Sequence, residues 1–373
     1  MHNSGLASVC QLSILMIEYE SEAEDQYMKQ KVTIQDIADA LGMSRNTVSK
    51  AINNSEGIAE ATRDKILKKA VEMGYKQFSY VASMTSIGTS KKAKQEESGE
   101  ISLFTTISLS NSHFASLFMD NIHEEITQMG YTLSVHRISR ENIKNRSLPR
   151  TFNREQSKGI ICIEVFDPRY CDMLSELGIP VLFVDGPARK NERSVNGDQL
   201  LMDNYTEITH FVNLMIERGL TKIGFIGDYE HCQSFWERYC AYRLAMISAG
   251  IEINEHYVIN TKDKDTDSLA DLLEDLKDIP EVYICANDFV AIDAIQLLIL
   301  SHKNILKKTR FLGFDDSHES RIFHPALSTV HIHSQSMAFS ALHLLMTRIK
   351  EPTMEYRTIY VATDLVLRES TEF

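Results

Sequence analysis

The feature that most limits the fold is an alternation of short apolar runs and helical patterns after residue 100. Strands are predicted at Ile101–Ile107, Tyr131–Val135, Gly159–Val165, Pro180–Val184, Lys222–Ile226, Val282–Ala286 and Arg310–Phe314. Helices are predicted at Phe114–Met129, Tyr205–Glu217, Trp236–Ala249, Ser268–Leu276, Phe289–Leu300 and Ser336–Lys350. This order predicts parallel sheets covered by helices on both faces, which bind ligands at the carboxyl ends of their strands.

A separate pattern of three short helices precedes that region, between residues 33 and 75. Thr33 and Ser44 are suited to cap the first two helices, Gly42 to form the tight turn between them, and Gly74 to end the third. The apolar positions predicted to face inward are Ile34, Ile37, Ala38 and Leu41, then Val48, Ala51 and Ile52, then Ile66, Leu67, Ala70 and Met73. This arrangement predicts an all-α helix-turn-helix head.

The outward side of the second helix carries side chains suited to duplex DNA. Arg45 and Lys50 can reach guanine edges, and Asn46 can pair with adenine. Short polar side chains suited to phosphate contacts are Thr33, Ser44, Thr47, Ser49 and Asn53. The alternative is a purely structural three-helix module with a solvated polar face.

Charge is distributed in a way that fits a DNA-binding head on an acidic body. The net charge is −13, yet residues 28–77 carry nine basic and six acidic residues. Residues 101–373 carry 27 basic and 38 acidic residues, and residues 1–27 carry five acidic residues with no Lys or Arg. We therefore predict a non-native or disordered extension at 1–27 with translation starting at Met28, a DNA-binding domain at 28–77, a linker at 78–100 and a body at 101–373.

Several bulk features exclude other classes of protein. The six cysteines lack CxxC spacing, so we expect reduced thiols without a metal or disulfide framework. No apolar stretch reaches the length of a membrane span, and the run before Glu18 has no basic residues ahead of it, unlike a secretory signal. A cytoplasmic protein without a membrane partner is predicted.

The head closely resembles the lactose-repressor (LacI/GalR) family of transcription regulators. The resemblance rests on the sequence VTIQDIADALGMSRNTVSKAIN at 32–53, EATRDKI at 60–66 and MGY at 73–75. It implies that Arg45, Asn46 and Lys50 read bases. Ala59 departs from the family's Ser cap, and residues 76–84 lack the family's Pro-Asn, so Met84 is either a minor-groove wedge or part of a flexible tether.

The body continues the resemblance through a series of ordered motifs. They are SNSHFA at 110–115, GIPVLFVD at 178–185, RGLTKIGFIG at 218–227, CAND at 285–288, GFDD at 313–316 and PALSTV at 325–330. The implied fold is the two-lobed, type I periplasmic-binding-protein-like α/β domain, joined by several crossovers, with an effector between the lobes. A homodimer on a near-palindromic operator is also implied.

The polar residues that follow the predicted strands are candidates for binding that effector. Asp185, Asn287, Asp288 and Asp315 each follow an apolar strand, and Arg238 is predicted at the start of a helix beside Trp236. Carboxylates, an amide, a guanidinium and aromatic faces suit a neutral polyol, so a sugar is the expected effector. The resemblance adds Ser110 and Phe114. Capping is the alternative role for each Asp, and Asp203, Asn204 and Asp316 are interpreted as structural.

Other site types lack their defining residues. There is no GxGxxG motif, nucleophile elbow or P-loop, and no cofactor or metal is expected. His331 and His333 share a strand face without a third ligand, and the acidic residues between 263 and 275 lack the Gly and closing Glu of a calcium loop. The remaining alternatives are a sugar-transport binding protein and a carbohydrate-acting enzyme, which the DNA-reading head and the absence of a signal peptide disfavour.

Overall fold

The computed structural model describes residues 33–52, 58–73, 99–106, 113–188, 195–262, 266–274, 276, 278–301 and 305–372. The chain divides into two compact units, Met1–Glu96 and Glu97–Phe373, which we treat separately as the head and the body. The predicted fold class, a helical head with a two-lobed α/β body, is confirmed. The predictions for residues 1–27, Asn53, Met84 and Ser110 lie outside the described residues.

The head contains helices α2 (Ile34–Leu41), α3 (Arg45–Ile52) and α4 (Glu60–Glu72). Thr33 caps α2 through a reciprocal pair of bonds: Asp36 N donates to Thr33 Oγ1 at 3.3 Å, and Thr33 N donates to Asp36 Oδ2 at 2.7 Å. Gly42 has φ 62°, so the turn between α2 and α3 uses the left-handed region that glycine tolerates. Ser44 Oγ accepts from Thr47 N at 3.1 Å and caps α3 as predicted.

The three helices of the head enclose one small apolar core. Its fully buried members come from all three helices: Ile37, Ala38, Val48, Ala51, Ile66 and Ala70. Ile34, Leu41 and Met73 are partly buried against them, as the predicted spacing requires. Because the inward side of α3 is occupied by this core, its polar side is left for another partner.

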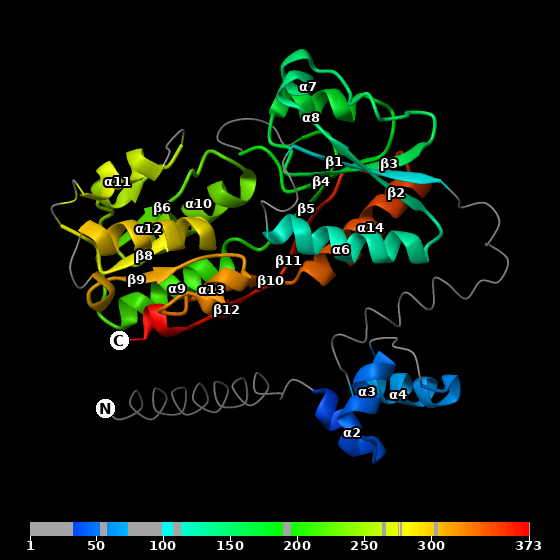
Figure 1. Ribbon diagram of the computed structural model, residues 1–373, viewed down its shortest axis with the longest axis horizontal. Helices are drawn as coiled ribbons and strands as arrows, with labels where there is room; N and C mark the ends of the chain where they lie inside the picture. The colour runs from blue at the N-terminus through cyan, green and yellow to red at the C-terminus, as the bar shows by residue number, and fades with distance from the viewer. Residues whose placement is uncertain are drawn as a thin grey trace, which may run out of the picture. The chain divides into compact units, whose positions relative to one another are not determined.

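Lobe 1 of the body is built on a parallel sheet in the order β11-β5-β4-β3-β1-β2 (Figure 1). Its strands are β1 (Glu100–Thr105), β2 (Thr132–Arg137), β3 (Ser157–Ile163), β4 (Val181–Val184), β5 (Asp198–Met202) and β11 (Thr358–Val361). Helices α6 (His113–Gln128) and α14 (Ser334–Lys350) cover one face of the sheet. Helices α7 (Arg140–Asn145) and α8 (Pro168–Ser175) pack on the other face.

Lobe 2 is built on a second parallel sheet in the order β7-β6-β8-β9. Its strands are β6 (Ile223–Ile226), β7 (Val258–Ile259), β8 (Val282–Cys285) and β9 (Arg310–Leu312). Its helices are α9 (Thr206–Glu217), α10 (Gln233–Ser248), α11 (Thr266–Glu274), α12 (Asp288–Ser301) and α13 (His318–Ile322). Helices α9 and α10 pack on one face of this sheet, and α11 and α12 pack on the other.

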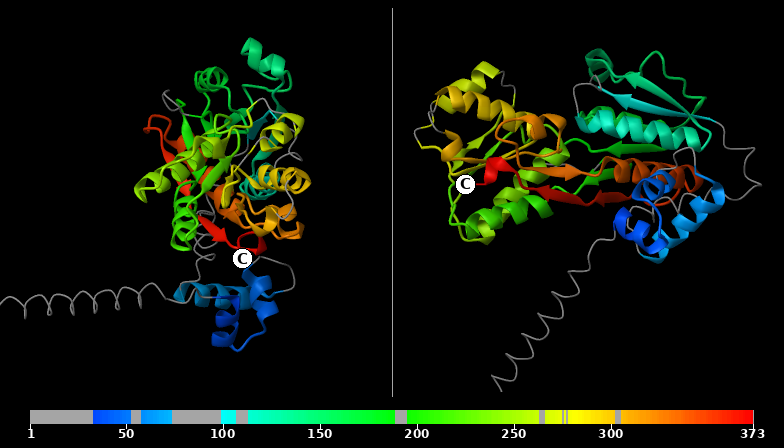
Figure 2. Two further views of the ribbon diagram at one scale, coloured as in Figure 1. Left: turned by 90° about the vertical axis from the view of Figure 1, so that its left-hand side faces the viewer. Right: turned by 60° about the horizontal axis from the view of Figure 1, so that its bottom comes forward.

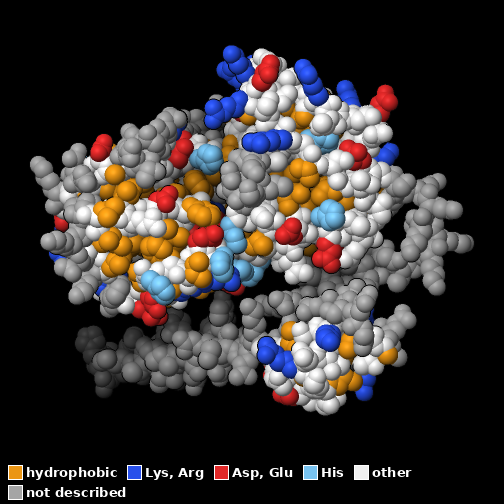
Figure 3. Space-filling model, in the orientation of Figure 1, with side chains coloured by type: hydrophobic (Ala, Val, Ile, Leu, Met, Phe, Trp, Pro, Cys, Tyr) orange, Lys and Arg blue, Asp and Glu red, His pale blue; other side chains and the backbone are white. Residues whose placement is uncertain are grey.

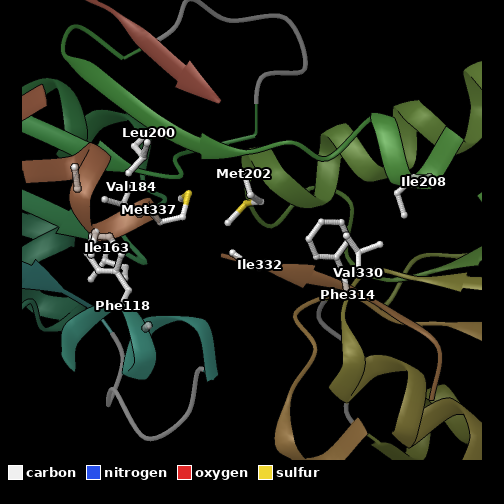
Figure 4. Close-up of a cluster of buried hydrophobic side chains, with 14 of the residues drawn as sticks. Phe118, Ile163, Val184, Leu200, Met202, Ile208, Phe314, Val330, Ile332 and Met337 are labelled. Atoms are coloured by element: carbon white, nitrogen blue, oxygen red, sulfur yellow. The ribbon is translucent and has the colours of Figure 1, made fainter. Parts of the chain in front are cut away.

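The chain passes between the lobes after β5, after β10 (Thr329–Ile332) and before β12 (Thr363–Val366). β10 and β12 pair antiparallel, and Asp203 N donates to Val361 O at 2.8 Å, so the crossing segments lie side by side (Figure 1 and Figure 2). The predicted several crossovers are therefore present. A continuous apolar core spans them, because Met202 and Ile332 lie between Leu200 on the lobe 1 side and Val330 on the lobe 2 side (Figure 4).

The predicted strands and helices of the body all occur, with ends that differ by a few residues. Helix α10 begins at Gln233, so Arg238 lies within the helix and does not begin it as predicted. The predicted strand ranges omit five strands of the described chain: β5, β7, β10, β11 and β12. Of these, β10 was recognised only as the strand that carries His331. Short helices α7, α8 and α13 were also missed.

Candidate DNA-reading surface and interlobe site

The outward face of α3 presents the three residues predicted to read bases. Arg45, Asn46 and Lys50 are exposed, whereas Val48 on the same helix is fully buried. The helix is short and begins directly after the Gly42 turn, so these side chains project from its first two turns. Exposed cationic and amide groups on a helix held by its opposite face can form hydrogen bonds with base edges in the major groove.

The residues predicted to contact phosphates surround that face. Thr33 and Ser44 are exposed at the starts of α2 and α3, and Thr47 and Ser49 are half-buried. The hydroxyls of Ser44 and Thr47 are 2.8 Å apart. The positive end of a helix dipole, at the helix start, also attracts phosphate.

In the body, the structure gathers four of the predicted effector residues between the lobes. Asp185 follows β4, Asp288 begins α12 after β8, Asp315 follows β9, and Arg238 comes from α10. Asp185 has φ 62° and Asp315 has φ 114°, a left-handed backbone that is uncommon for residues other than glycine. Such conformations concentrate at ligand sites, where the fold holds them in place.

Arg238 lies at the centre of this group and is 2% exposed. Its Nε donates to Asn204 Oδ1 at 2.9 Å and its Nη1 to Ala286 O at 2.6 Å. The guanidinium lies 3.5 Å from the centroid of the Phe314 ring, a desolvated cation–π contact worth about 2 kcal/mol. Burial lowers the pKa of Arg238, and the nearby carboxylate of Asp315 opposes that shift.

Asp185 connects the two lobes directly. Its Oδ1 accepts from Gly186 N at 2.8 Å and from Ser234 N, at the start of α10, at 3.1 Å. Gln233 N also donates across the lobes to Gly186 O at 2.8 Å. Burial raises the pKa of Asp185. The N-terminus of α10 is thus held against the end of β4.

Asp288 and Asp315 differ in how their carboxylates are used. Asp288 is fully buried, and its oxygens accept from Thr329 Oγ1 at 2.6 Å and Ser317 N at 2.7 Å. Burial raises its pKa to about 6. Asp315 is partly exposed, and burial raises its pKa to about 8 although Arg238 acts in the opposite direction. Both carboxyls therefore favour the protonated form more than an exposed Asp does.

The other predicted effector residues that the structure describes have partners of their own. Phe114 packs on Phe118 within α6, with ring centroids 5.8 Å apart. Trp236 lies 5.9 Å from the ring of Tyr239 and packs against the main apolar core. Asn287 Oδ1 caps α12 by accepting from Val290 N at 2.9 Å.

Sequence reasoning missed a buried polar network beside Arg238. Glu237 accepts from Gln233 Nε2 at 2.8 Å, from Tyr360 Oη at 3.0 Å and from Asn204 Nδ2 at 2.9 Å. Asn204 lies just after β5 and Tyr360 lies on β11, so the network joins α10 to two segments beside the crossovers. The only signal in the sequence was an adjacent Glu-Arg pair inside a helix that otherwise has an apolar side.

The residues interpreted as structural or set aside also have protein partners. Asp203 caps α9 through Thr206 N at 3.0 Å, and Asp316 pairs with Arg321 at 2.6 Å. His331 Nδ1 lies 3.0 Å from Asp316 Oδ2, and His333 Nε2 lies 3.1 Å from an oxygen of Asp364. No group of three His, Cys, Asp or Glu residues able to hold a metal ion occurs in the described part of the chain.

A surface cavity of about 380 Å³ occurs on lobe 1 between α6 and β2, away from the interlobe site. Its lining residues are Ser116, Met119, Asp120, His123, Leu133 and Val135. None of the predicted effector residues is among them. Within the described ranges, no helix is both long and apolar enough to cross a membrane.

Comparisons with known proteins agree with these two units. The model of the bacterial regulatory proteins of the lacI family matches residues 33–77, and the periplasmic binding protein-like domain model matches residues 212–371. The HTH-type transcriptional repressor PurR of Photobacterium profundum is 26% identical over 347 residues, covering 91% of this chain and 98% of that protein. PurR of Haemophilus influenzae is 25% identical over 348 residues, covering the same shares.

Solved structures share the fold. A transcriptional regulator CelR–cellobiose complex has a TM-score of 0.62 at 21% identity, covering 91% of this chain and 100% of the other. The lac repressor dimer bound to operator and the anti-inducer ONPF has a TM-score of 0.61 at 17% identity, covering 92% and 99%.

A head of this kind on a two-lobed body defines a DNA-binding transcription regulator with an effector-binding domain. The chain belongs to the lacI family of bacterial regulatory proteins. The membership favours a regulator over a transport protein or an enzyme, and the predicted resemblance is confirmed.

Proposed function

We propose that this protein is a dimeric repressor whose head reads a near-palindromic operator through Arg45, Asn46 and Lys50. The supporting observation is that these side chains are exposed on one helix whose opposite side is locked into the head's core. Contacts to phosphates by Thr33, Ser44, Thr47, Ser49 and Asn53 would set the register of the helix without reading sequence. The PurR relatives are named as transcriptional repressors, which supports repression over activation of transcription by this protein.

We further propose that a small polyol, of the sugar class, binds between the lobes and changes operator affinity. The observation that carries this proposal is that Asp185 and Asp315, held at strand ends, and Arg238, on α10, come together between the lobes. Carboxylate and guanidinium groups pair with neighbouring hydroxyls. Complexes with cellobiose and with D-xylulofuranose are described for proteins of the same fold.

The remaining candidate residues would contact the effector less directly. Phe114, Trp236 and Asn287 would make outer contacts with the effector, and a contact by Ser110 is proposed from the family resemblance alone. Asp288 would act indirectly, because its oxygens already hold Ser317, after β9, and Thr329, on β10. Closure of the lobes around the effector would favour one arrangement of the two heads in the dimer, which is a population shift.

A sugar panel in a thermal-unfolding assay on the full chain tests the effector proposal. One sugar at about 100 times its Kd should stabilise the protein by about 2.7 kcal/mol. Asp315→Asn should remove that response while the protein still folds, because burial already disfavours the charge at this position. Lys308→Gln, an exposed change in lobe 2, serves as the control. The proposal fails if every sugar leaves the unfolding temperature unchanged, or if Asp315→Asn responds like the unmodified protein.

A further inference from the structure

A cluster of basic side chains lies on lobe 1, far in sequence from the head. We call it the basic edge; it consists of Lys144, Arg146, Arg150, Arg154 and Lys158, all of them exposed. Residues 144–158 contain these five bases and one acid, Glu155, in a protein whose net charge is −13. Figure 3 shows Lys and Arg side chains gathered over the part of lobe 1 that carries α7 and α8.

The bases of this edge are not used to build the lobe. Lys144, Arg146, Arg150 and Lys158 have no ion pair with a carboxylate of the described chain, unlike Lys222 and Lys262 in lobe 2. Arg154 donates to the carbonyl of Leu177, which leaves its positive charge without a carboxylate partner. Unpaired like charges repel one another, so a surface that gathers them is stabilised by an anionic partner.

One member of the basic edge lies beside the first residues of the body. Lys158 is at the start of β3, and its side chain packs against Gly99, which precedes β1. Glu100 N donates to Gln156 O at 3.4 Å. From there the edge extends along the side of lobe 1 towards Arg150, next to Thr151, whose hydroxyl lies 2.9 Å from His136 Nδ1 on β2.

The composition of the surface favours a phosphate backbone over a protein. Protein interfaces bury an apolar or aromatic centre. The large exposed hydrophobic residues of the described chain include none between residues 136 and 188. Flexible cations without an apolar anchor suit phosphates, which need charge but little shape complementarity.

We propose that the basic edge of lobe 1 is a second DNA-contacting surface, which binds duplex phosphates without reading sequence. The head would choose the site, and the body would add an electrostatic contact to the same or a neighbouring stretch of duplex. This function is separate from base reading by α3 and from effector binding between the lobes.

The salt dependence of binding by the full chain tests the proposal. The probe is a random-sequence duplex of about 60 base pairs, titrated between about 50 and 200 mM salt. The variant Lys144→Gln/Arg150→Gln/Lys158→Gln removes three exposed bases, and Lys222→Gln/Lys262→Gln/Lys308→Gln removes three from lobe 2 as a matched control. Each lost phosphate contact lowers the slope of log K against log salt by about 0.9, so the basic-edge variant should lose about 2.7 and the control close to none.

Each other outcome overturns the proposal. An unchanged slope in the basic-edge variant means that the surface does not contact DNA. An equal loss in the control means that only net charge matters. An unchanged DNA slope with weakened binding to polyglutamate means that the surface binds an acidic protein. The result does not depend on base reading, because the preference for a selected site over random duplex should be the same in all three proteins.

Discussion

Glu237→Gln tests the buried network that joins α10 to the crossover segments. Three donors point at the Glu237 side chain, which is 2% exposed, so the network is complete with a carboxylate at its centre. The glutamine keeps one acceptor oxygen and replaces the other by an NH₂ group. That group would face Asn204 Nδ2, a donor. Rotating the Asn204 amide by 180° would break another hydrogen bond, because Asn204 Oδ1 already accepts from Arg238 Nε at 2.9 Å.

The expected cost follows from these contacts. A hydrogen bond to a charged group contributes about 1.5–3 kcal/mol, and removing its acceptor from a buried donor costs about 1–3 kcal/mol, more where a charged group is involved. We expect Glu237→Gln to lower the free energy of unfolding by about 2–4 kcal/mol. Tyr360→Phe removes a single donor and leaves the carboxylate with Gln233 and Asn204, so it should cost about 1 kcal/mol.

Urea unfolding of the full chain, followed by far-UV circular dichroism, measures both variants. Glu237→Gln should lower the free energy of unfolding more than Tyr360→Phe does. A Glu237→Gln protein within about 0.5 kcal/mol of the unmodified chain would refute the reasoning. So would a Tyr360→Phe protein that is less stable than Glu237→Gln.

Three further predictions concern other parts of the molecule. Asp198→Asn should lower the free energy of unfolding in urea by about 3–5 kcal/mol, because it leaves the buried Arg348 guanidinium without its carboxylate partner. Arg348 donates to Asp198 at 2.8 and 3.1 Å. An unchanged free energy of unfolding would contradict this prediction. Thr33→Ala should destabilise the head by about 1 kcal/mol in thermal unfolding and Thr33→Ser should not, since serine retains the capping oxygen. Because burial raises the pKa of Asp315 to about 8, its stabilising protonated form is lost as the pH rises from about 4 to 8. The unfolding temperature of Asp315→Asn, measured relative to that of the unmodified protein, should therefore rise between pH 5 and pH 8.5. If the difference between the two unfolding temperatures stays constant over this range, the pKa of Asp315 is not raised.

The sequence predicted the head well because its signals are local. The cap at Thr33, the turn at Gly42 and the spacing of Ile37, Ala38 and Val48 all act within a few residues of one another. Helix period and turn chemistry therefore determined the three helices without knowledge of distant contacts.

The missed strands depend on partners that are distant in sequence. β5 begins with Asp198, a residue that disfavours strands and is 1% exposed here. It is tolerated because Arg348 and the backbone N–H of Arg357, more than a hundred residues later, complete its hydrogen bonds. β11 is a partly exposed edge strand, whose alternating pattern in four residues is too short to identify from sequence alone.

The arrangement of the candidate effector residues was predictable only in part, for the same reason. The sequence placed Asp185 and Asp315 after apolar strands and Arg238 near the start of a helix, and their role in effector binding stays a prediction. The contacts of Asn204 and Glu237 with Arg238 were not predictable, because they require the crossover segments to be placed against α10. The basic edge was overlooked although its five bases lie within residues 144–158, because the charge was counted over the acidic body as a whole.

Selection from random duplexes by the full chain tests most directly whether the outward side of α3 reads DNA. We expect a near-palindromic site that is bound at least about a thousandfold more tightly than random duplex at physiological salt. Arg45→Ala and Lys50→Ala should each lose about 1–3 kcal/mol of preference at particular base positions, whereas Ser49→Ala should weaken binding to all sequences alike. If the full chain binds the selected pool no better than random duplex, or if the variants keep every base preference, the outward side of α3 does not read DNA.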